Sequence, residues 1–269
     1  MKLAFAALAV LAMPMAALAQ PAAPAPAPMT VLAQSSEYRF QMDFHVSDAA
    51  LAKLLPAGWV SNAATQGAAK DANIRLIFVD AGNIVGPDNK LLGKGNDLLV
   101  YAAAPVKEAN GPGTGQMILA GISLNRGDAT FGAMAPANIA KVSRSQVTIN
   151  GATVVTEDWD FAADDGEHAS LHVKYTRATA NRGGSTVNFY DTVNPALMQS
   201  VKTEQVTDIT RNVTTTPPDR VAEFSYKAGG GKLASLFDGS EKPLSWDSQP
   251  IYNRTISGNY ATVHIGPLH

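Results

Sequence analysis

Two lysines are the residues in this sequence whose side chains could carry out covalent chemistry. A lysine amine in an apolar site loses its proton more easily and can attack a carbonyl group to form a Schiff base. Lys141 follows a loop rich in alanine, and Lys174 lies in the strand-like segment His168 to Arg177, opposite its apolar face. The alternative is that each lysine is simply solvated. Alternation does not decide which face lines a cavity, so both are candidate catalytic and ligand-binding residues.

Trp159 is a third candidate for contact with a ligand. It shares a strand face with Val155, Glu157 and Phe161. Large aromatic side chains are mostly buried, so this face lines either a packed core or a cavity. Both interpretations stay open at this point.

No metal or cofactor site is indicated by the residue spacing. His168 and His172 are four residues apart, which on a strand places their rings about 13 Å apart, too far for one ion. The acidic run at 157–167 surrounds a turn and lacks calcium-loop spacing, so we interpret it as solvated, with weak calcium binding as the alternative. The chain contains neither a Gly-x-Ser-x-Gly elbow nor a phosphate loop. We expect no metal and no cofactor.

These candidates lie on strands of a predicted antiparallel meander between Ala129 and Asp191. Three residue pairs that favour tight turns separate segments rich in Val, Ile, Thr, Phe and Tyr. The pairs are Asn150-Gly151, Asp165-Gly166 and Gly183-Gly184. Near the start of the chain, Glu37 to Val46 alternates apolar and polar residues without a break, which predicts another strand.

The rest of the chain predicts further strands and two or three short helices. Ser47-Asp48 offers a helix N-cap, and Lys232 to Phe237 predicts a second short helix. Ten or eleven strands predict a mainly β (β-rich α+β) fold, an antiparallel closed or nearly closed barrel or a double sheet. Such a sheet can enclose a small-molecule cavity. Further strand-like runs lie at 74–80, 97–106, 116–124, 201–215, 221–228, 250–256 and 260–265.

The N-terminus predicts export. Residues 1–19 have one lysine, an apolar run and a small-x-small ending, so we expect a signal peptide cleaved after Ala19 and no membrane span afterwards. Residues 20–36 predict an Ala/Pro-rich flexible segment, and 37–269 a single domain. The absence of cysteine and the slight acidic excess exclude disulfides and give no nucleic-acid footprint. A periplasmic or secreted location follows as an expectation.

One segment resembles a known family. Pro136 to Val142, followed by the Asn150-Gly151 hairpin, is similar to the Gly-x-Pro-Lys-Lys-Leu-Ala segment of the acetoacetate decarboxylase superfamily. The order of the surrounding parts is similar too: an early strand, a short helix ending in Leu54-Leu55-Pro56, and Val187-Asn188-Phe189 ahead of a later strand. The resemblance implies the β fold of that family, and it covers most of the mature chain.

The residues of the family's chemistry do not match. In those enzymes the first lysine after the proline forms the Schiff base, whereas this chain has Ala137 and Asn138 after Pro136. The residues before Gly132 also lack the family's Arg-Glu pair, and Gly132 lies two residues further from the proline than the family's spacing requires. The resemblance therefore implies a divergent member without the Schiff-base motif.

Three functions remain open. The first is an exported binding protein for a small apolar molecule or a carbonyl or carboxylate compound, without decarboxylase activity. The second is a divergent enzyme of the same superfamily, a carbon–carbon lyase on a small oxo acid, acting through Lys141, Lys174 or other residues. The third is a structural or partner-binding envelope protein. An oligomer is compatible with each, and the favoured hypothesis is the first.

Overall fold

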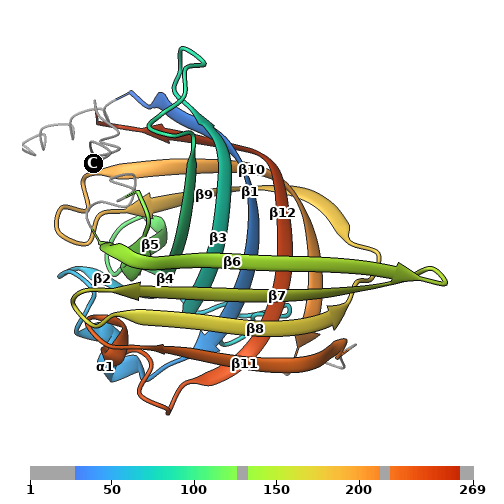
Figure 1. Ribbon diagram of the computed structural model, residues 1–269. Helices are drawn as coiled ribbons and strands as arrows, with labels where there is room; N and C mark the ends of the chain where they lie inside the picture. Colours follow the sequence, from blue (N-terminus) through green and yellow to red (C-terminus); the bar gives the residue numbers. More distant parts are fainter. Residues whose placement is uncertain (1–27, 126–132, 213–218, 261–269) are drawn as a thin grey trace, which may run out of the picture.

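The computed structural model describes residues 28–125, 133–212 and 219–260, and these residues form a mainly β structure (Figure 1). Helix is confined in this part of the chain to one short α-helix and one 3-10 turn, as the sequence predicted. The strands are β1 (Thr30–His45), β2 (Trp59–Ser61), β3 (Ile74–Val85), β4 (Asn96–Glu108), β5 (Thr114–Ser123), β6 (Ala135–Ile149), β7 (Ala152–Ala163), β8 (His168–Thr176), β9 (Asn181–Tyr190), β10 (Met198–Asn212), β11 (Val221–Gly229) and β12 (Lys242–Gly258), with α1 at Asp48–Ala52 and η2 at Leu233–Ser235.

Seven strands follow one another around a partial ring. Their order is β5-β9-β10-β12-β1-β3-β4, and β4 pairs with β5 again. Most of these neighbours are paired antiparallel over long stretches, but β5 meets β9 only at Gln116 and Phe189. The ring is therefore joined at a single residue pair there. The nearly closed antiparallel sheet expected from the sequence takes this form.

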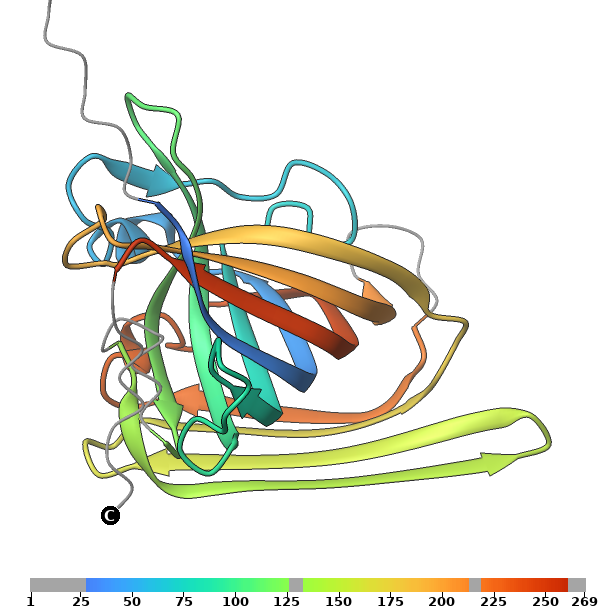
Figure 2. The same cartoon turned by 90° about the horizontal axis from the view of Figure 1, so that it is seen from above.

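The other long strands form a second layer across the outside of the ring. β6, β7, β8 and β11 lie side by side and cross in front of β3, β1 and β12 (Figure 1). Seen from above, the hairpin of β6 and β7 runs along one side and reaches past the other strands (Figure 2). Crosswise packing of two twisted sheets buries the inner face of each.

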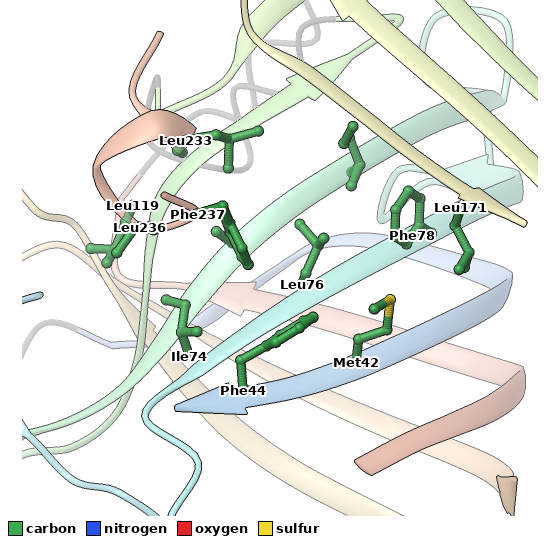
Figure 3. Packing of buried hydrophobic residues seen from close by; sticks show 14 of the residues in the cluster. Met42, Phe44, Ile74, Leu76, Phe78, Leu119, Leu171, Leu233, Leu236 and Phe237 are labelled. Carbon is green, nitrogen blue, oxygen red and sulfur yellow. The ribbon is translucent and has the colours of Figure 1, made fainter. Parts of the chain in front are cut away.

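A large apolar core fills the space between the ring and this layer. Phe44 of β1 packs edge-on against Phe237 at a ring-centroid distance of 5.5 Å, and Phe78 of β3 packs against Trp159 of β7 at 5.9 Å. Met42, Leu76 and the other residues labelled in Figure 3 surround them. Removing about 25 cal/mol per Å² of apolar surface from water makes this core a main source of stability.

Strand β1 is buried on both faces, which its alternating sequence did not reveal. Its apolar residues, among them Phe40 and Met42, face the second layer. Its polar residues Arg39, Gln41 and Asp43 are nevertheless 9%, 8% and 2% exposed, because they point into the ring. The polar face of this strand is thus an interior face.

Several predicted elements are confirmed by the structure. The Asn150-Gly151 pair turns between β6 and β7 with φ values of 52° and 83°. Ser47 caps α1, where its hydroxyl accepts a hydrogen bond from the Ala50 amide. The predicted meander holds for β6, β7 and β8, which pair antiparallel in sequence order.

Other predictions were wrong in detail. Gly183-Gly184 is not a turn: both lie inside β9, where Gly183 pairs with Gln205, and β9 joins the ring instead of continuing the meander. The connection between β8 and β9 lies at 177–180, before the two glycines, and β9 does not pair with β8. Residues 30–36, predicted as flexible, belong to β1 because β12 pairs with them. The run 250–256 is part of the longer β12.

Some predictions concern residues outside the described ranges. They include the signal peptide at 1–19, most of the Ala/Pro-rich segment, the residues just before Gly132, and the end of the chain after Tyr260. In the described ranges, no helix is long and apolar enough to cross a membrane.

Candidate ligand-binding pocket inside the ring

The interior of the ring contains a pocket of about 280 Å³. Each of the seven ring strands contributes at least one side chain to its wall. One part of the wall is apolar and is formed by Ile77, Tyr101, Val187, Phe189 and Val201. The remainder is polar and includes Arg39, Gln41, Arg75, Gln116, Thr203 and Gln249. An apolar wall with a few convergent polar groups is typical of small-molecule sites.

Beside the polar part of the pocket wall, two guanidinium groups share one buried carboxylate. Arg39 Nη2 and Arg254 Nη1 each lie 2.6 Å from an oxygen of Glu37, and the Glu37 side chain is fully buried. Burial by itself would raise the pKa of Glu37, but the charges of Arg254 and Arg39 hold that pKa below its usual value. This group of three carries a net positive charge, which favours an anionic ligand.

Two aspartates, Asp43 and Asp247, lie close together at a second place beside the polar part of the wall. Asp43 lies opposite Ser245, and Gln41 lies opposite Asp247, so the two carboxyl groups are diagonal neighbours on one face of the β1–β12 pair. Asp43 Oδ1 lies 3.2 Å from Arg75 Nε, and Ser245 Oγ donates to Asp43 Oδ2 at 3.0 Å.

The two aspartates share the charge of one nearby cation, the Arg75 guanidinium. Burial and the nearby charge of Asp43 raise the pKa of Asp247 to about 7, although a hydrogen bond from Gln249 favours its ionised form. Burial also raises the pKa of Asp43, while Arg75 opposes that change. Neither aspartate lines the pocket, whereas their partners Gln41, Arg75 and Gln249 do. The pair can therefore hold or release a proton near neutral pH behind the wall.

Gln116 presents an acceptor without a donor. It is 7% exposed and lines the pocket at the point where β5 meets β9. Within the described part of the chain, its Oε1 atom is buried and accepts no hydrogen bond. A buried acceptor without a partner costs about 1–3 kcal/mol, so such an atom marks a place where a ligand group or a water can donate.

The β9–β10 wall carries a ladder of hydroxyl and amide groups. Ser185 and Thr203 hydroxyls lie 2.9 Å apart, Thr203 donates to Gln205 Oε1 at 2.9 Å, and Gln205 donates to Thr207 at 3.1 Å. These side chains satisfy one another and form a polar surface in the pocket. They suit a ligand with hydrogen-bonding groups along its length.

The three residues predicted from the sequence lie elsewhere. Lys141 is exposed on β6, and Lys174 on β8 forms an ion pair of 2.6 Å with Glu223. Trp159 is 2% exposed, packs in the core between the layers and donates to Glu157 at 3.0 Å. None of the three lines the pocket in the ring, and the structure does not bring them together with it. Their roles in catalysis or binding stay predictions.

Histidine and carboxylate groups show no metal arrangement in the described residues. His172 Nδ1 lies 2.7 Å from Asp158 and the other ring nitrogen 3.4 Å from Glu223. In that part of the chain, no group of three or more His, Asp or Glu side chains is placed to hold an ion. His172 is part of a surface ion-pair network with Lys174.

The pocket residues could have been found from one signal in the sequence. The alternation of Glu37 to Val46 places Arg39, Gln41 and Asp43 on one face. Because a polar strand face usually meets solvent, the alternation by itself does not mark this face as a site. Gln116 and Arg75 carried no comparable signal, since each is a polar residue between apolar ones, in a largely apolar strand without polar alternation.

No family model matches the chain, and no curated protein matches it. Among solved structures, it is similar to an acetoacetate decarboxylase-like enzyme from Sphingomonas wittichii RW1, with 9% identity and a TM-score of 0.47 over 86% of this chain and 92% of that one.

Two other structures are similar at the same level. The enduracididine biosynthesis enzyme MppR, complexed with a condensation product of pyruvate and imidazole 4-carboxaldehyde, has 11% identity and a TM-score of 0.48 over 90% of this chain and 92% of that one. Acetoacetate decarboxylase from Legionella pneumophila subsp. pneumophila str. Philadelphia 1 has 12% identity and a TM-score of 0.44 over 93% and 95%. At these identities and TM-scores, no family membership, residue role or ligand is transferred from these structures to this chain.

Proposed function

We propose that the chain is an exported, periplasmic binding protein that holds a small polar molecule inside the ring of strands. The observation that carries this proposal is the buried Gln116 acceptor, which has no donor among the described residues and lines a pocket of about 280 Å³. The guanidinium groups of Arg39 and Arg75 in the same wall give the occupant's acidic group a place to bind.

Imine chemistry has no support in this pocket. Among the described residues that line it there is no lysine, so no amine is placed to attack a bound carbonyl group. Ala137 and Asn138, at the positions of the family's two lysines, cannot form an imine either. Binding without decarboxylation is therefore the simpler proposal.

The binding proposal is tested by changing Gln116 to leucine, which keeps the side-chain size and removes the acceptor. Small polar acids and hydroxylated molecules are screened by thermal shift, and each hit is measured by calorimetry. We expect Gln116→Leu to weaken a true pocket ligand roughly tenfold, because one buried hydrogen bond contributes about 1.5 kcal/mol. As a control, Gln66→Leu at an exposed position should leave the affinity for the ligand unchanged. Ligands that bind wild-type protein and Gln116→Leu with the same affinity would contradict the proposed site.

A divergent lyase acting on a small oxo acid is the second candidate function. The observation in its favour is the Asp43–Asp247 pair, which lies behind the pocket wall and contacts it through Arg75, 3.2 Å from Asp43. Burial and Asp43 raise the pKa of Asp247 to about 7, a range in which a group can supply or accept a proton, and Asp247 would act through the wall residues and not on the substrate directly. Release of carbon dioxide or another fragment from a small oxo acid, lost in Asp247→Asn, would favour this function over simple binding.

The proposed location is tested separately from binding. Cell fractionation of the native host should recover the protein in the periplasmic fraction, with its N-terminus at Gln20. A cytoplasmic protein that retains Met1 would reject the export part of the proposal and leave the pocket untouched. A ring interior packed solid in an experimental structure would instead favour a structural or partner-binding role.

A further inference from the structure

Arg75 brings hydrogen-bond donors to the pocket that no group of the described chain uses. Its side chain lines the pocket and is partly exposed. Its one ion pair among the described residues joins Nε to Asp43 at 3.2 Å, and the buried Nε atom is not aligned for a hydrogen bond. A guanidinium group carries five N–H donors in a planar fork that matches a carboxylate. The terminal nitrogens of Arg75 are thus available to the acidic group of a ligand.

The wall of the pocket is cationic. Its lining residues in the described chain include two arginines, Arg39 and Arg75, and no acidic residue. The carboxylates that pair with these arginines, Glu37 and Asp43, are buried and do not line the pocket. The wall therefore favours an anionic group and disfavours an ammonium group, because it presents no carboxylate to pair with one.

Arg75 and Gln116 face the same part of the ring interior. Arg75 lies opposite Ala103 of β4, which lies opposite Ile118 of β5, two residues after Gln116. Neighbouring strands are about 4.8 Å apart, so the backbones of β3 and β5 are about 10 Å apart here. From that separation, two long side chains on the inner face of a curved sheet can both reach one small molecule.

The Gln116 side chain can distinguish a hydroxyl group from an oxo group. Its Oε1 atom is buried without a donor among the described residues, so a ligand group that only accepts hydrogen bonds leaves it unpaired. A hydroxyl group both donates and accepts, so it can pair with Oε1 and with the amide nitrogen of the same side chain. Sites built around a hydrogen bond to a ligand O–H group discriminate strongly against analogues that lack it.

Apolar side chains flank both polar groups. Ile77 is the next residue after Arg75 on the inner face of β3, and Tyr101 of β4 lies opposite it. Phe189 pairs with Gln116 where β5 meets β9. All three apolar residues line the pocket. A small aliphatic group of the ligand can be buried against them.

We propose that the ring takes a short aliphatic hydroxy acid, whose carboxylate binds Arg75 and whose hydroxyl group pairs with Gln116. This inference rests on the proposed function, because it needs the pocket in the ring to be a binding site. It goes further by naming the ligand class. It also ranks the hydroxy acid above the oxo acid and the amino acid that share its carbon skeleton.

The test measures the affinity of the wild-type protein by calorimetry for three sets of acids. Each set contains a hydroxy acid, an oxo acid and an amino acid with one carbon skeleton: lactate, pyruvate and alanine; α-hydroxyisovalerate, α-oxoisovalerate and valine; β-hydroxybutyrate, acetoacetate and β-aminobutyrate. At least one hydroxy acid should bind roughly tenfold more tightly than both of its counterparts. The oxo acid leaves the Gln116 acceptor unpaired, and the amino acid brings a cation beside the arginines. Equal affinities within every set would overturn the inference.

Two variants assign the two contacts. Gln116→Leu should bring the hydroxy acid and its oxo counterpart within about threefold of each other, because the atom that distinguishes them is removed. Arg75→Lys should weaken both acids by a similar factor, roughly three- to tenfold, since it keeps a cation beside Asp43 but loses the planar fork. Arg182→Lys, at an exposed position on β9, is its matched control and should leave both affinities unchanged. Circular dichroism and the melting temperature check that each variant is folded.

The possible failures are distinguishable. If the three acids of a set bind equally and Gln116→Leu weakens them all, the hydroxy acid inference fails and the proposed function stands. The same holds if none of these acids binds while another ligand responds to Gln116→Leu. If no ligand of any kind binds in the ring, both fail. A preference for the hydroxy acid that persists in Gln116→Leu would overturn the role given to Gln116.

Discussion

Tyr38 of β1 and Glu157 of β7 join the two layers of the molecule through a hydrogen bond of 2.8 Å. The Tyr175 hydroxyl and the Trp159 indole also donate to the same carboxyl group, each at 3.0 Å. Burial raises the pKa of Glu157, while the Arg144 charge and these hydrogen bonds oppose that change. The next residue after Tyr38, Arg39, faces the pocket in the ring. Neighbouring residues of β1 thus hold the layers together and form the candidate site.

Tyr38→Phe should destabilise the fold by about 1–3 kcal/mol, because Glu157 would lose one of its donors in a buried site. The measurement is the free energy of unfolding from urea titration. Tyr252 is 62% exposed, so Tyr252→Phe should stay within about 0.5 kcal/mol of the wild type. Equal effects of the two changes would mean that the hydrogen bonds to Glu157 do not hold the layers together.

Asp247 should make the fold less stable as pH rises. Burial and the Asp43 charge raise the pKa of Asp247 from 3.8 to about 7 in the folded protein. Its stabilising contribution is therefore complete below about pH 4 and is lost as the pH rises toward 7, because only the unfolded chain releases the proton easily.

Asp247→Asn should remove that part of the pH dependence, which amounts to at most ~1.4 kcal/mol per pH unit for one group. The free energy of unfolding is measured from pH 4 to pH 8 for both proteins. Asp160→Asn, at an exposed position on β7, is the control. If the free energy of unfolding changes with pH in Asp247→Asn as it does in the wild type, a group other than Asp247 causes this pH dependence.

Lys141 and Lys174 should not form a Schiff base. One is exposed and the other is paired with Glu223 at 2.6 Å, so neither amine is desolvated as a nucleophilic lysine must be. Borohydride added with acetoacetate or pyruvate should leave the intact mass of the mature protein unchanged. A reduced adduct mapped to either lysine by peptide mass spectrometry would favour the divergent enzyme.

Gln116→Leu should stabilise the ligand-free protein by about 1 kcal/mol or more. The Gln116 Oε1 atom is buried without a donor in the described residues, and leucine would remove this unsatisfied acceptor at nearly the same volume. Thermal and urea unfolding without ligand provide the measurement. A loss of stability would indicate that Gln116 has a structural partner and is not kept for a ligand.

The fold was predicted in kind because its signals are local. The Asn150-Gly151 turn, the alternation in β1 and the Ser47 cap each depend on residues a few positions apart. The family resemblance added the order of the parts. The role of Gly183-Gly184 was mistaken because the connection from β8 to β9 lies at 177–180, before the two glycines, and β9 pairs with β10 and β5 instead of β8. No short-range signal in the sequence shows that β9 leaves the meander and joins the ring.

The candidate site was largely missed for a related reason. Alternation showed that Arg39, Gln41 and Asp43 share a face, but only ring closure makes that face an interior one. Lys141, Lys174 and Trp159 have side chains suited to catalysis or binding, but all three lie on the outer layer of β6, β7 and β8. The type of a residue indicates what chemistry it could do, but the pairing of the ring strands determines which side chains lie together in the pocket.

Native mass spectrometry of the protein purified from its own host tests binding in the ring most directly. Wild-type protein should carry a small bound molecule that is lost or strongly reduced in Gln116→Leu and retained in Gln66→Leu. Wild-type protein that consistently carries no molecule and binds none of the acids offered to it, or a bound molecule indifferent to Gln116, would contradict it.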